Sequence, residues 1–273
     1  MDKSLLVRIL GFPVLLLHGD LLVLDRWRWL RRHLPRRTGK DLLLDVGCGN
    51  GAFSIGAARL GYLALGLSWD QRNQQVASDR AHMCHAPGAS FEIQDIRFLA
   101  ERRDLRQKFH VAICLEAIEH VLDDRRLMQA MAECLQPGGR LLLTAPFLNY
   151  RAISPSDNGP FSDVEDGWHV RRGYSSAMLI ELCQHAGLIT EEISYCGGFL
   201  SQKMTWAFRL LSRNHPLLVW GLTLPLRLLP PLLDPLLGRL TGWPPFSIGL
   251  VAYKPRFSTD KQPHKIKTSR VGI

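Results

Sequence analysis

Residues 42–51, LLLDVGCGNG, constrain the fold more than any other part of the chain. An apolar run is followed by glycines at every second position, Gly47, Gly49 and Gly51, and then by a helical pattern over 52–60. Glycine tolerates positive φ angles and lets the backbone approach a ligand closely. Such a turn, at the carboxyl end of a strand, is where α/β sheets bind ligands. Many nucleotide-binding folds have a glycine-rich turn, so the turn alone does not identify the ligand.

Apolar segments typical of strands alternate with helical patterns along the chain. We expect strands at 62–67, 91–94, 111–115 and 140–144, with helices at 71–84 and 123–135. Strands that alternate with helices form a parallel sheet covered on both faces. A polar loop, 146–173, is followed by a helix and by two further strands, 188–195 and 246–253. We therefore predict an α/β fold with a Rossmann-like, doubly wound sheet of seven strands.

The chain divides into three parts. Residues 1–40 are predicted to be a helical N-terminal segment, 41–254 the main domain, and 255–273 a disordered basic tail. An insert, 198–245, separates the last two strands. Twelve of the 25 residues from 216 to 240 are leucine and five are proline. Because proline interrupts helices, we expect short apolar helical pieces in this insert.

Four motifs, in order, resemble those of the class I S-adenosylmethionine-dependent methyltransferases. The glycine turn resembles motif I of that family, FEIQDI at 91–96 resembles the end of strand three, and LQPGGRL at 135–141 resembles the turn before strand five. In the family, the second strand usually ends in an acid that holds the ribose hydroxyls. Here Ser68 stands at that position and Asp70 follows two residues later, which departs from the usual pattern.

The resemblance covers about residues 41–197 and implies S-adenosylmethionine as the cofactor. Ser68 or Asp70 would lie near the ribose, and Asp95 near the adenine amino group. The implied cofactor site comprises Asp45, Gly47, Cys48, Gly49, Gly51, Ser68, Trp69, Asp70, Asp95, Ile96, Leu115 and Glu116. The alternative, a nicotinamide-dependent oxidoreductase, usually has G-x-G-x-x-G or G-x-x-x-G after its first strand.

Directly after the expected fourth strand, residues 116–120 read EAIEH. In a helix, Glu116, Glu119 and His120 would lie on one face and point toward the methyl donor. Together with the downstream His169, this pattern resembles two groups of methyltransferases. They are the O-methyltransferases of ubiquinone biosynthesis and the small-RNA 2′-O-methyltransferases, and in both groups the pattern is associated with a divalent cation.

The resemblance implies that Glu116, Glu119, His120 and His169 together hold Mg²⁺ or Mn²⁺. A metal would lower the pKa of the acceptor hydroxyl and fix its position. Without a metal, His169 or His120 would act as general base, and Glu119 completes the set of catalytic candidates. Metal-free methyltransferases carry a similar sequence after this strand, so the residues leave both alternatives open.

The net charge of the chain and the composition of the insert indicate what kind of methyl acceptor to expect. The net charge is +9, with 26 Arg against 8 Lys, which favours an anionic partner. The insert combines apolar residues with Arg209, Arg213, Arg227 and Arg239, which suits a membrane surface or a lipid-linked substrate. We therefore expect O-methylation of a hydroxyl on a hydrophobic or lipid-linked small molecule, with peripheral membrane contact through 198–245. Packing of the insert onto the domain is the alternative.

Two other functions stay open. The positive charge and the E-x-x-E-H pattern also suit an RNA 2′-O-methyltransferase. No aromatic platform for stacking bases is visible, so a nucleic acid is the less favoured partner. A non-catalytic S-adenosylmethionine-binding module is the third function, and the intact glycines disfavour it.

The cysteines and the apolar segments indicate a compartment. The six cysteines include no C-x-x-C pair, so they match neither a zinc site nor a secreted disulfide framework. No apolar segment reaches the roughly 18 residues needed to span a bilayer. We therefore expect a reducing, cytoplasmic location, with peripheral contact to a membrane if the insert binds lipid.

Overall fold

The computed structural model describes residues 3–17, 20–36, 40–212, 216–256 and 266–269. Eight strands form one sheet in the order β3-β2-β1-β4-β5-β7-β6-β8. They are β1 (Leu42–Val46), β2 (Leu63–Ser68), β3 (Ala89–Ile93), β4 (Phe109–Leu115), β5 (Leu135–Pro146), β6 (Ile189–Cys196), β7 (Ser247–Tyr253) and β8 (Lys267–Ser269). Neighbouring strands pair in parallel, except that β7 runs antiparallel to β5 and β6. The predicted α/β, Rossmann-like sheet is confirmed.

The sheet has one strand more than predicted. β8 pairs in parallel with the outer edge of β6. It lies within 255–273, for which the sequence predicts a disordered tail, and that prediction is wrong for Lys267–Ser269. The reason is tertiary, because an edge strand leaves backbone N–H and C=O groups unpaired and an extended segment can take them up. The tail residues 257–265 and 270–273 lie outside the described part of the chain.

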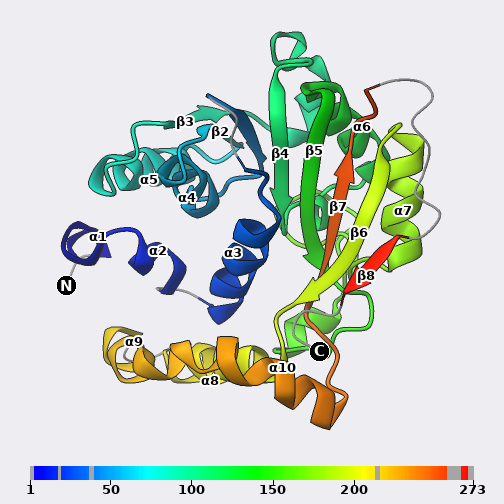
Figure 1. Cartoon of the computed structure of the whole chain (residues 1–273). Coiled ribbons are helices and arrows are strands. Elements are labelled where there is room, and N and C mark those ends of the chain that lie inside the picture. Colours follow the sequence, from blue (N-terminus) through cyan, green and yellow to red (C-terminus); the bar gives the residue numbers. More distant parts are fainter. Residues whose placement is uncertain (1–2, 18–19, 37–39, 213–215, 257–265, 270–273) are drawn as a thin grey trace.

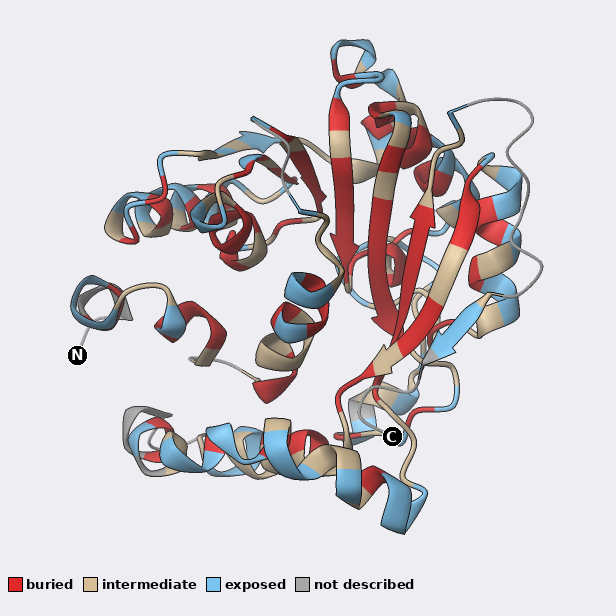
Figure 2. Ribbon diagram, viewed as in Figure 1, coloured by how far each residue is buried: buried red, intermediate tan, exposed pale blue. Residues whose placement is uncertain are grey.

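Helices cover both faces of the sheet (Figure 1). On one face pack α6 (Asp124–Cys134) and α7 (Ser176–His185), and on the other α3 (Leu21–His33) and α4 (Ala52–Arg59), with α5 (Gln71–Met83) beside α4 and β3. Side chains alternate between the two cores along β1, because successive residues of a strand point to opposite faces. Leu44 belongs to the core under α6 and α7, and Leu43 to the core under α3. The central strands are buried along most of their length (Figure 2).

The N-terminal residues form three helices, α1 (Lys3–Leu10), α2 (Pro13–Leu17) and α3. On α3, the Trp29 indole N–H donates to the Ser194 hydroxyl of β6 at 2.8 Å. Gly249 of β7 leaves room for this indole, because a Cβ there would lie 2.6 Å from it. The helix α3 is thus fixed against the sheet and shares its core.

The insert between β6 and β7 forms a layer of short helices below the N-terminal helices (Figure 1). It consists of α8 (Phe199–Leu211), α9 (Pro216–Thr223), a 3₁₀ turn (Pro225–Leu228) and α10 (Pro230–Thr241). The last three begin at prolines, which are tolerated in the first turn of a helix. Arg213 of the insert lies outside the described residues. Within the described residues, no helix combines the length and the apolar character needed to cross a membrane.

Candidate active site

The glycine turn joins β1 to α4 at the carboxyl edge of the sheet. The backbone N–H groups of Gly47 and Cys48 donate to the Leu67 carbonyl of β2 at 3.0 and 2.9 Å. All three glycines have positive φ, at +85°, +50° and +80° in chain order. A Cβ on Gly47 would lie 2.5 Å from the Ala117 Cβ, whereas one on Gly49 would meet nothing within 4 Å. Space for a ligand is therefore open beside Gly49.

Asp45, the acid ahead of the turn, lies inside the protein. Its carboxylate accepts a hydrogen bond of 2.6 Å from the Ser54 hydroxyl of α4, and only 1% of the residue is exposed. Burial raises the pKa of Asp45 to about 7. Gly51 precedes the first residue of α4, and Cys48 is buried as well. Asp45 therefore ties the strand to the helix beneath the turn, and the glycine backbone faces outward.

The end of β2 presents Ser68, Trp69 and Asp70 beside the turn. The Ser68 hydroxyl is buried and lies 3.5 Å from the Asp70 backbone N–H. Asp70 caps α5, because its Oδ1 accepts from the Asn73 N–H at 2.9 Å. Its Oδ2 has no hydrogen-bond partner among the described residues. Trp69 is exposed, and its indole lies beside Gly167 of the loop that follows β5.

Asp95 follows β3 and is held by an arginine. Arg97 Nε donates to Asp95 Oδ2 at 2.9 Å, and Arg97 Nη1 donates to Glu165 Oε2 at 3.1 Å. Burial opposes the charge of Asp95, but the hydrogen bonds from Arg97 prevail and lower its pKa. Ile96 is half-buried and packs near Gly47. An ionised Asp95 is thus held by Arg97 directly after β3.

Leu115 and Glu116 lie at the end of β4. Leu115 is buried, and Glu116 has a φ of +53°, which is uncommon for a residue other than glycine. Glu116 Oε2 accepts from Arg26 Nη2 of α3 at 2.9 Å. This pair connects the N-terminal helix to the sheet edge next to the glycine turn.

Beyond Glu116, the structure brings Glu119, His120 and His169 together. One ligand atom from each lies within 4.8 Å of the others, and the two imidazole centroids are 4.7 Å apart. The segment Ile118–His120 forms a single 3₁₀ turn, not the longer helix that would align Glu116 with the others. Glu116 does not join this group and is paired with Arg26. Of the four residues predicted to hold a metal, the structure thus brings together Glu119, His120 and His169 and leaves Glu116 on Arg26.

Three polar atoms of this cluster are buried without hydrogen-bond partners in the described part of the chain. Glu119 is 1% exposed, and neither of its carboxylate oxygens nor Nδ1 of His120 has a hydrogen-bond partner among the described residues. Burial raises the pKa of Glu119 well above its usual value, and Glu116 adds to the shift. Burial lowers the pKa of His169, and His120 adds to that shift. Buried polar atoms without partners are costly and mark places where a ligand or proton belongs.

A family model described as a methyltransferase domain matches residues 24–193, which is more than half of the chain. The chain belongs to the methyltransferase domain family. Its cofactor is S-adenosylmethionine, as the glycine turn and the following motifs predict. The predicted resemblance to the class I S-adenosylmethionine-dependent methyltransferases is thereby confirmed.

Curated relatives of this methyltransferase match part of the chain. It is 31% identical over 110 residues to the ubiquinone biosynthesis O-methyltransferase of Coxiella burnetii, covering 40% of this chain and 45% of that protein. It is 35% identical over 116 residues to the enzyme of the same name from Shewanella pealeana, covering 42% and 47%. The chain thus spans about half the length of the curated relatives it matches.

Solved structures share the fold at low sequence identity. Phosphoethanolamine N-methyltransferase 2 of Haemonchus contortus, in complex with S-adenosyl-L-methionine, has a TM-score of 0.63 and 17% identity, over 93% of this chain and 60% of that one. A sarcosine dimethylglycine methyltransferase from Galdieria sulphuraria, described as putative, has a TM-score of 0.58 and 16% identity, over 86% of each chain. The [4+2]-cyclase SpnF has a TM-score of 0.53 and 18% identity, over 80% and 75%. The fold therefore does not determine the reaction.

The loop 146–173 places His169 of the methyltransferase. The backbone N–H of Val170 donates to the Glu119 carbonyl at 3.0 Å. Glu165 Oε1 accepts from the Leu122 N–H at 2.6 Å, and Arg171 Nη2 donates to the carbonyls of Val121 and Leu122 at 2.8 Å each. The loop is thus held on the segment that follows β4.

Two charged residues of the site were not predicted from the sequence: Arg26 and Arg97. Arg97 follows Asp95 by two residues, a spacing that allows a local ion pair and could have suggested it. Arg26 precedes Glu116 by 90 positions, and nothing in the sequence connects the two. Only the placement of α3 on the sheet brings them together.

Proposed function

We propose that this methyltransferase transfers the methyl group of S-adenosylmethionine to a hydroxyl on a hydrophobic or lipid-linked small molecule. One observation carries the proposal: Glu119, His120 and His169 converge beyond the end of β4, on the sheet edge that also holds the open glycine turn. Methyl transfer to a hydroxyl requires in-line positioning of the reactants and removal of one proton. The cluster supplies groups that suit both requirements.

In the proposed reaction, the C–S bond of the donor breaks as the C–O bond to the acceptor forms. The hydroxyl proton passes to an imidazole nitrogen of His169 or His120. Glu119 Oε1 lies 4.0 Å from His120 Nε2, so its carboxylate would stabilise an imidazolium there. In this arrangement, the hydrogen bond from the Val170 N–H to the Glu119 carbonyl would hold the neighbouring His169 near the acceptor.

The same three side chains would hold Mg²⁺ or Mn²⁺. The buried Glu119 oxygens and Nδ1 of His120 lack partners, which fits a cation, and two imidazoles suit Mn²⁺ better than Mg²⁺. A bound metal would lower the pKa of the acceptor hydroxyl. Manganese should then raise the melting temperature of the wild type and leave that of Glu119→Gln unchanged. Full activity after complete chelation, with no manganese-dependent shift, would leave a histidine as general base.

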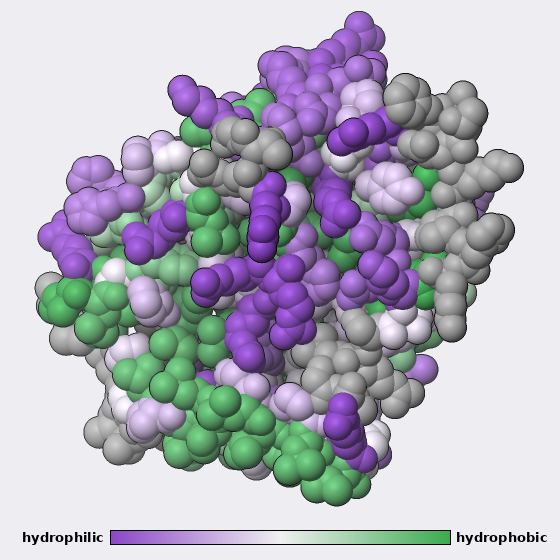
Figure 3. Space-filling model, viewed as in Figure 1, coloured by the Kyte–Doolittle hydropathy of each residue, from purple (hydrophilic) through white to green (hydrophobic). Residues whose placement is uncertain are grey.

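The outer surface of the insert supports a hydrophobic acceptor. Hydrophobic side chains gather over α8–α10 (Figure 3). We call this surface the leucine face; its exposed members are Trp206, Leu210, Leu211, Leu226, Leu228, Leu229, Leu232, Leu233, Leu236 and Leu240. Leu232 and Leu240 are 72% and 73% exposed. Soluble proteins rarely expose apolar patches larger than a few hundred Å², and larger ones mark interaction sites.

The charges around the leucine face favour an anionic lipid bilayer as its partner. Asp234 is the single acidic residue in 199–241, and its carboxylate accepts from the backbone N–H groups of Leu200 and Ser201. Lys203 and Arg239 of the same layer are exposed. An apolar surface flanked by cations suits the headgroup region of an anionic membrane. We therefore include peripheral membrane contact in the proposed function.

Radiolabelled S-adenosylmethionine tests the proposed reaction. The purified protein is incubated with the labelled donor and a lysate of its source organism, and an organic lipid extract is separated from the aqueous polymers. We expect label in the organic phase, lost in His169→Ala and retained in His185→Ala, an exposed histidine at the end of α7.

Two other outcomes would contradict this function. Label in the aqueous phase that nuclease removes would establish the RNA 2′-O-methyltransferase instead. Donor binding without label in any fraction would indicate a non-catalytic S-adenosylmethionine-binding module.

A further inference from the structure

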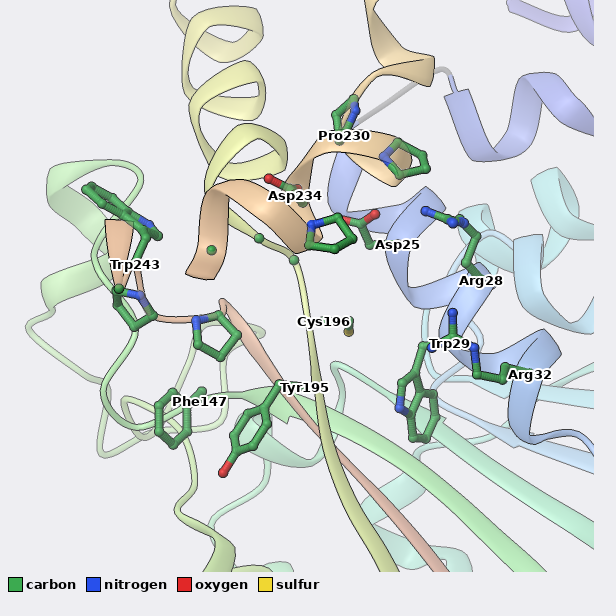
Figure 4. A pocket seen from close by; sticks show the side chains of 18 residues that line it. Asp25, Arg28, Trp29, Arg32, Phe147, Tyr195, Cys196, Pro230, Asp234 and Trp243 are labelled. Atoms are coloured by element: carbon green, nitrogen blue, oxygen red, sulfur yellow. The ribbon is translucent and has the colours of Figure 1, made fainter. Parts of the chain in front are cut away.

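A cavity of 420 Å³ lies between α3, the ends of β5 and β6, and α10 (Figure 4). Small-molecule sites typically have volumes of roughly 300–1,000 Å³. Neither the glycine turn nor the Glu119–His120–His169 cluster lines it. Cys196 lines the cavity, and burial raises the pKa of its thiol, to which the charge of Glu116 adds. Asp25 also lines the cavity and directly precedes Arg26, which pairs with Glu116 at 2.9 Å, so the cavity lies near this ion pair.

The cavity has mostly apolar walls, and α10 forms one of them. This helix contributes Pro230, Pro231, Pro235 and Gly238, while its exposed leucines belong to the leucine face. Aromatic side chains form much of the remaining wall: Trp29, Phe147, Tyr195 and Trp243. Rigid prolines and aromatic rings give a preformed apolar surface, which lowers the entropic cost of binding an apolar molecule. The same helix thus separates the cavity from the proposed membrane surface.

Two arginines of α3, Arg28 and Arg32, also line the cavity, one helical turn apart (Figure 4). Both are exposed, and within the described residues neither forms an ion pair with a carboxylate. Arg26 of the same helix, by contrast, is paired with Glu116. The guanidinium group matches phosphate and carboxylate oxygens in a bidentate manner. An anionic group would therefore find two donors at the edge of an apolar cavity.

Two acidic residues, Asp25 and Asp234, also line the cavity, and Asp234 forms part of the contact between α10 and α8. The Asp234 carboxylate accepts from the N–H groups of Leu200 and Ser201 at 2.5 and 3.1 Å, at the start of α8. A helix N-terminus stabilises such a charge. Burial raises the pKa of Asp25 to about 6, against the opposing charges of Arg28 and Arg26. The N-terminus of α8 thus already stabilises the charge of Asp234. The guanidinium group of Arg32, and in part that of Arg28, remain available to an anionic ligand.

We propose that this cavity binds an amphiphile, with its apolar part against α10 and its anionic group on Arg28 and Arg32. The proposal rests on the proposed function only in identifying that amphiphile as the methyl acceptor, because α3 carries both the two cavity arginines and Arg26, which pairs with Glu116. Binding itself requires neither the methyl donor nor turnover.

Farnesyl monophosphate, an isoprenoid chain with one phosphate, is a suitable probe. Its binding to the full chain can be followed by isothermal titration calorimetry below its micelle concentration. Farnesol and inorganic phosphate serve as the two partial ligands. We expect farnesyl monophosphate to bind at least about tenfold more tightly than either, a difference of about 1.4 kcal/mol. If farnesol binds as tightly as farnesyl monophosphate, the cavity has no anion site. If inorganic phosphate binds as tightly, the apolar walls do not contribute to binding.

Gly238→Leu fills the cavity without straining the backbone. A Cβ on Gly238 would meet nothing within 4 Å, and leucine favours the helix more than glycine does. Gly221→Leu on α9 is the matched control, because Gly221 is also helical with open space around it but lies outside the cavity. We expect Gly238→Leu to weaken binding of farnesyl monophosphate about tenfold or more, and Gly221→Leu to leave it unchanged. Equal binding by both variants would exclude this cavity.

The double variant Arg28→Gln/Arg32→Gln tests the anion site. It should remove the preference for farnesyl monophosphate over farnesol and leave farnesol binding unchanged. A retained preference would show that the phosphate binds elsewhere. If the wild type binds farnesyl monophosphate only in the presence of phosphatidylglycerol vesicles, the arginines serve the membrane surface and the cavity proposal is wrong. Binding without methyl transfer would leave the cavity site standing and refute the proposed function alone.

Discussion

At the scale of single residues, Glu119 is the most costly side chain of the proposed site. Its two carboxylate oxygens are buried and lack hydrogen-bond partners within the described residues. At neutral pH the group must either keep an unbalanced charge or take up a proton, and both reduce stability. Proteins retain such groups where function needs them, at the expense of stability.

Replacement of Glu119 by glutamine should therefore separate stability from activity. We expect Glu119→Gln to raise the free energy of unfolding by about 1–3 kcal/mol and to abolish methyl transfer. Urea unfolding and a donor-based activity assay measure the two effects. Glu181→Gln, at an exposed glutamate of α7, is the control and should change neither. A less stable Glu119→Gln protein would mean that the carboxyl group holds the fold together.

Asp45 gives the folding equilibrium a defined pH dependence. Its folded pKa of about 7 exceeds the usual 3.8, so the folded state binds more protons than the unfolded state between these values. Stability should fall as the pH rises through this window, by up to about 4 kcal/mol. The Ser54 hydroxyl donates to this carboxyl, and the charge of Asp45 adds to the effect of burial in raising the pKa of the Cys48 and Cys114 thiols.

Urea unfolding at pH 4.5 and pH 8 checks the Asp45 prediction. Asp45→Asn removes the titrating group, so its stability should depend less on pH than that of the wild type. Asp79→Asn, on the exposed side of α5, should follow the wild-type profile. Identical profiles for Asp45→Asn and the wild type would contradict the raised pKa.

At the scale of elements, the turn between β1 and α4 contains glycines with different tasks. A Cβ on Gly47 would collide with Ala117, whereas one on Gly49 would enter open space. Gly47→Ala should lower the free energy of unfolding by about 2–4 kcal/mol, from strain at positive φ and from the clash. Gly49→Ala should lower the free energy of unfolding by only about 1–2 kcal/mol, from the strain alone. It also places a methyl group where the methyl donor should bind.

Calorimetric titration with S-adenosylmethionine distinguishes the two glycine variants. We expect Gly49→Ala to lose at least about tenfold in affinity, or about 1.4 kcal/mol, beyond any loss explained by its stability. If Gly49→Ala binds the donor as the wild type does, the donor does not lie against this turn.

The loop that carries His169 depends on a chain of charges. Arg97 connects Asp95 to Glu165, and Glu165 accepts from the Leu122 backbone. Arg97→Gln should increase hydrogen exchange in 162–170 and reduce kcat, while global stability falls by less than about 1 kcal/mol because the ion pairs are partly exposed. Arg106→Gln, which removes the Arg106–Glu133 pair elsewhere, is the control. Unchanged exchange in 162–170 would mean that other contacts hold the loop.

At the scale of the whole molecule, the leucine face is an apolar surface that the described part of the chain leaves exposed. The triple variant Leu232→Ser/Leu236→Ser/Leu240→Ser should bind phosphatidylglycerol vesicles at least about a hundredfold more weakly than the wild type, because each buried leucine contributes about 1.5–3 kcal/mol. Vesicle co-sedimentation measures this difference. Leu60→Ser/Leu63→Ser removes exposed leucines near α4 and β2, and should bind as the wild type does.

Two results would exclude a membrane at the leucine face. One is equal vesicle binding by the triple variant and the wild type. The other is a dimer in solution that the triple variant abolishes, which would show that a second copy of the chain covers this face.

Much of the architecture and the identity of the cofactor could be predicted from the sequence, because both depend on local patterns. Alternating apolar segments determine strands and helices, and the glycines in 47–51 mark the turn by their spacing. The short helices of the insert follow from its prolines. Each of these features needs only neighbours along the chain.

The remaining features depend on residues that are far apart in sequence. Only the folded sheet pairs β8 with β6, brings Arg26 to Glu116, and places His169 beside Glu119 and His120. The same holds for the cavity under α10, which forms between a helix near the N-terminus and an insert near the C-terminus. The sequence by itself determined the fold class and the cofactor, since periodicity and turn chemistry are local. The tertiary structure decided which charges are buried, paired or free, because burial depends on the packing of distant segments.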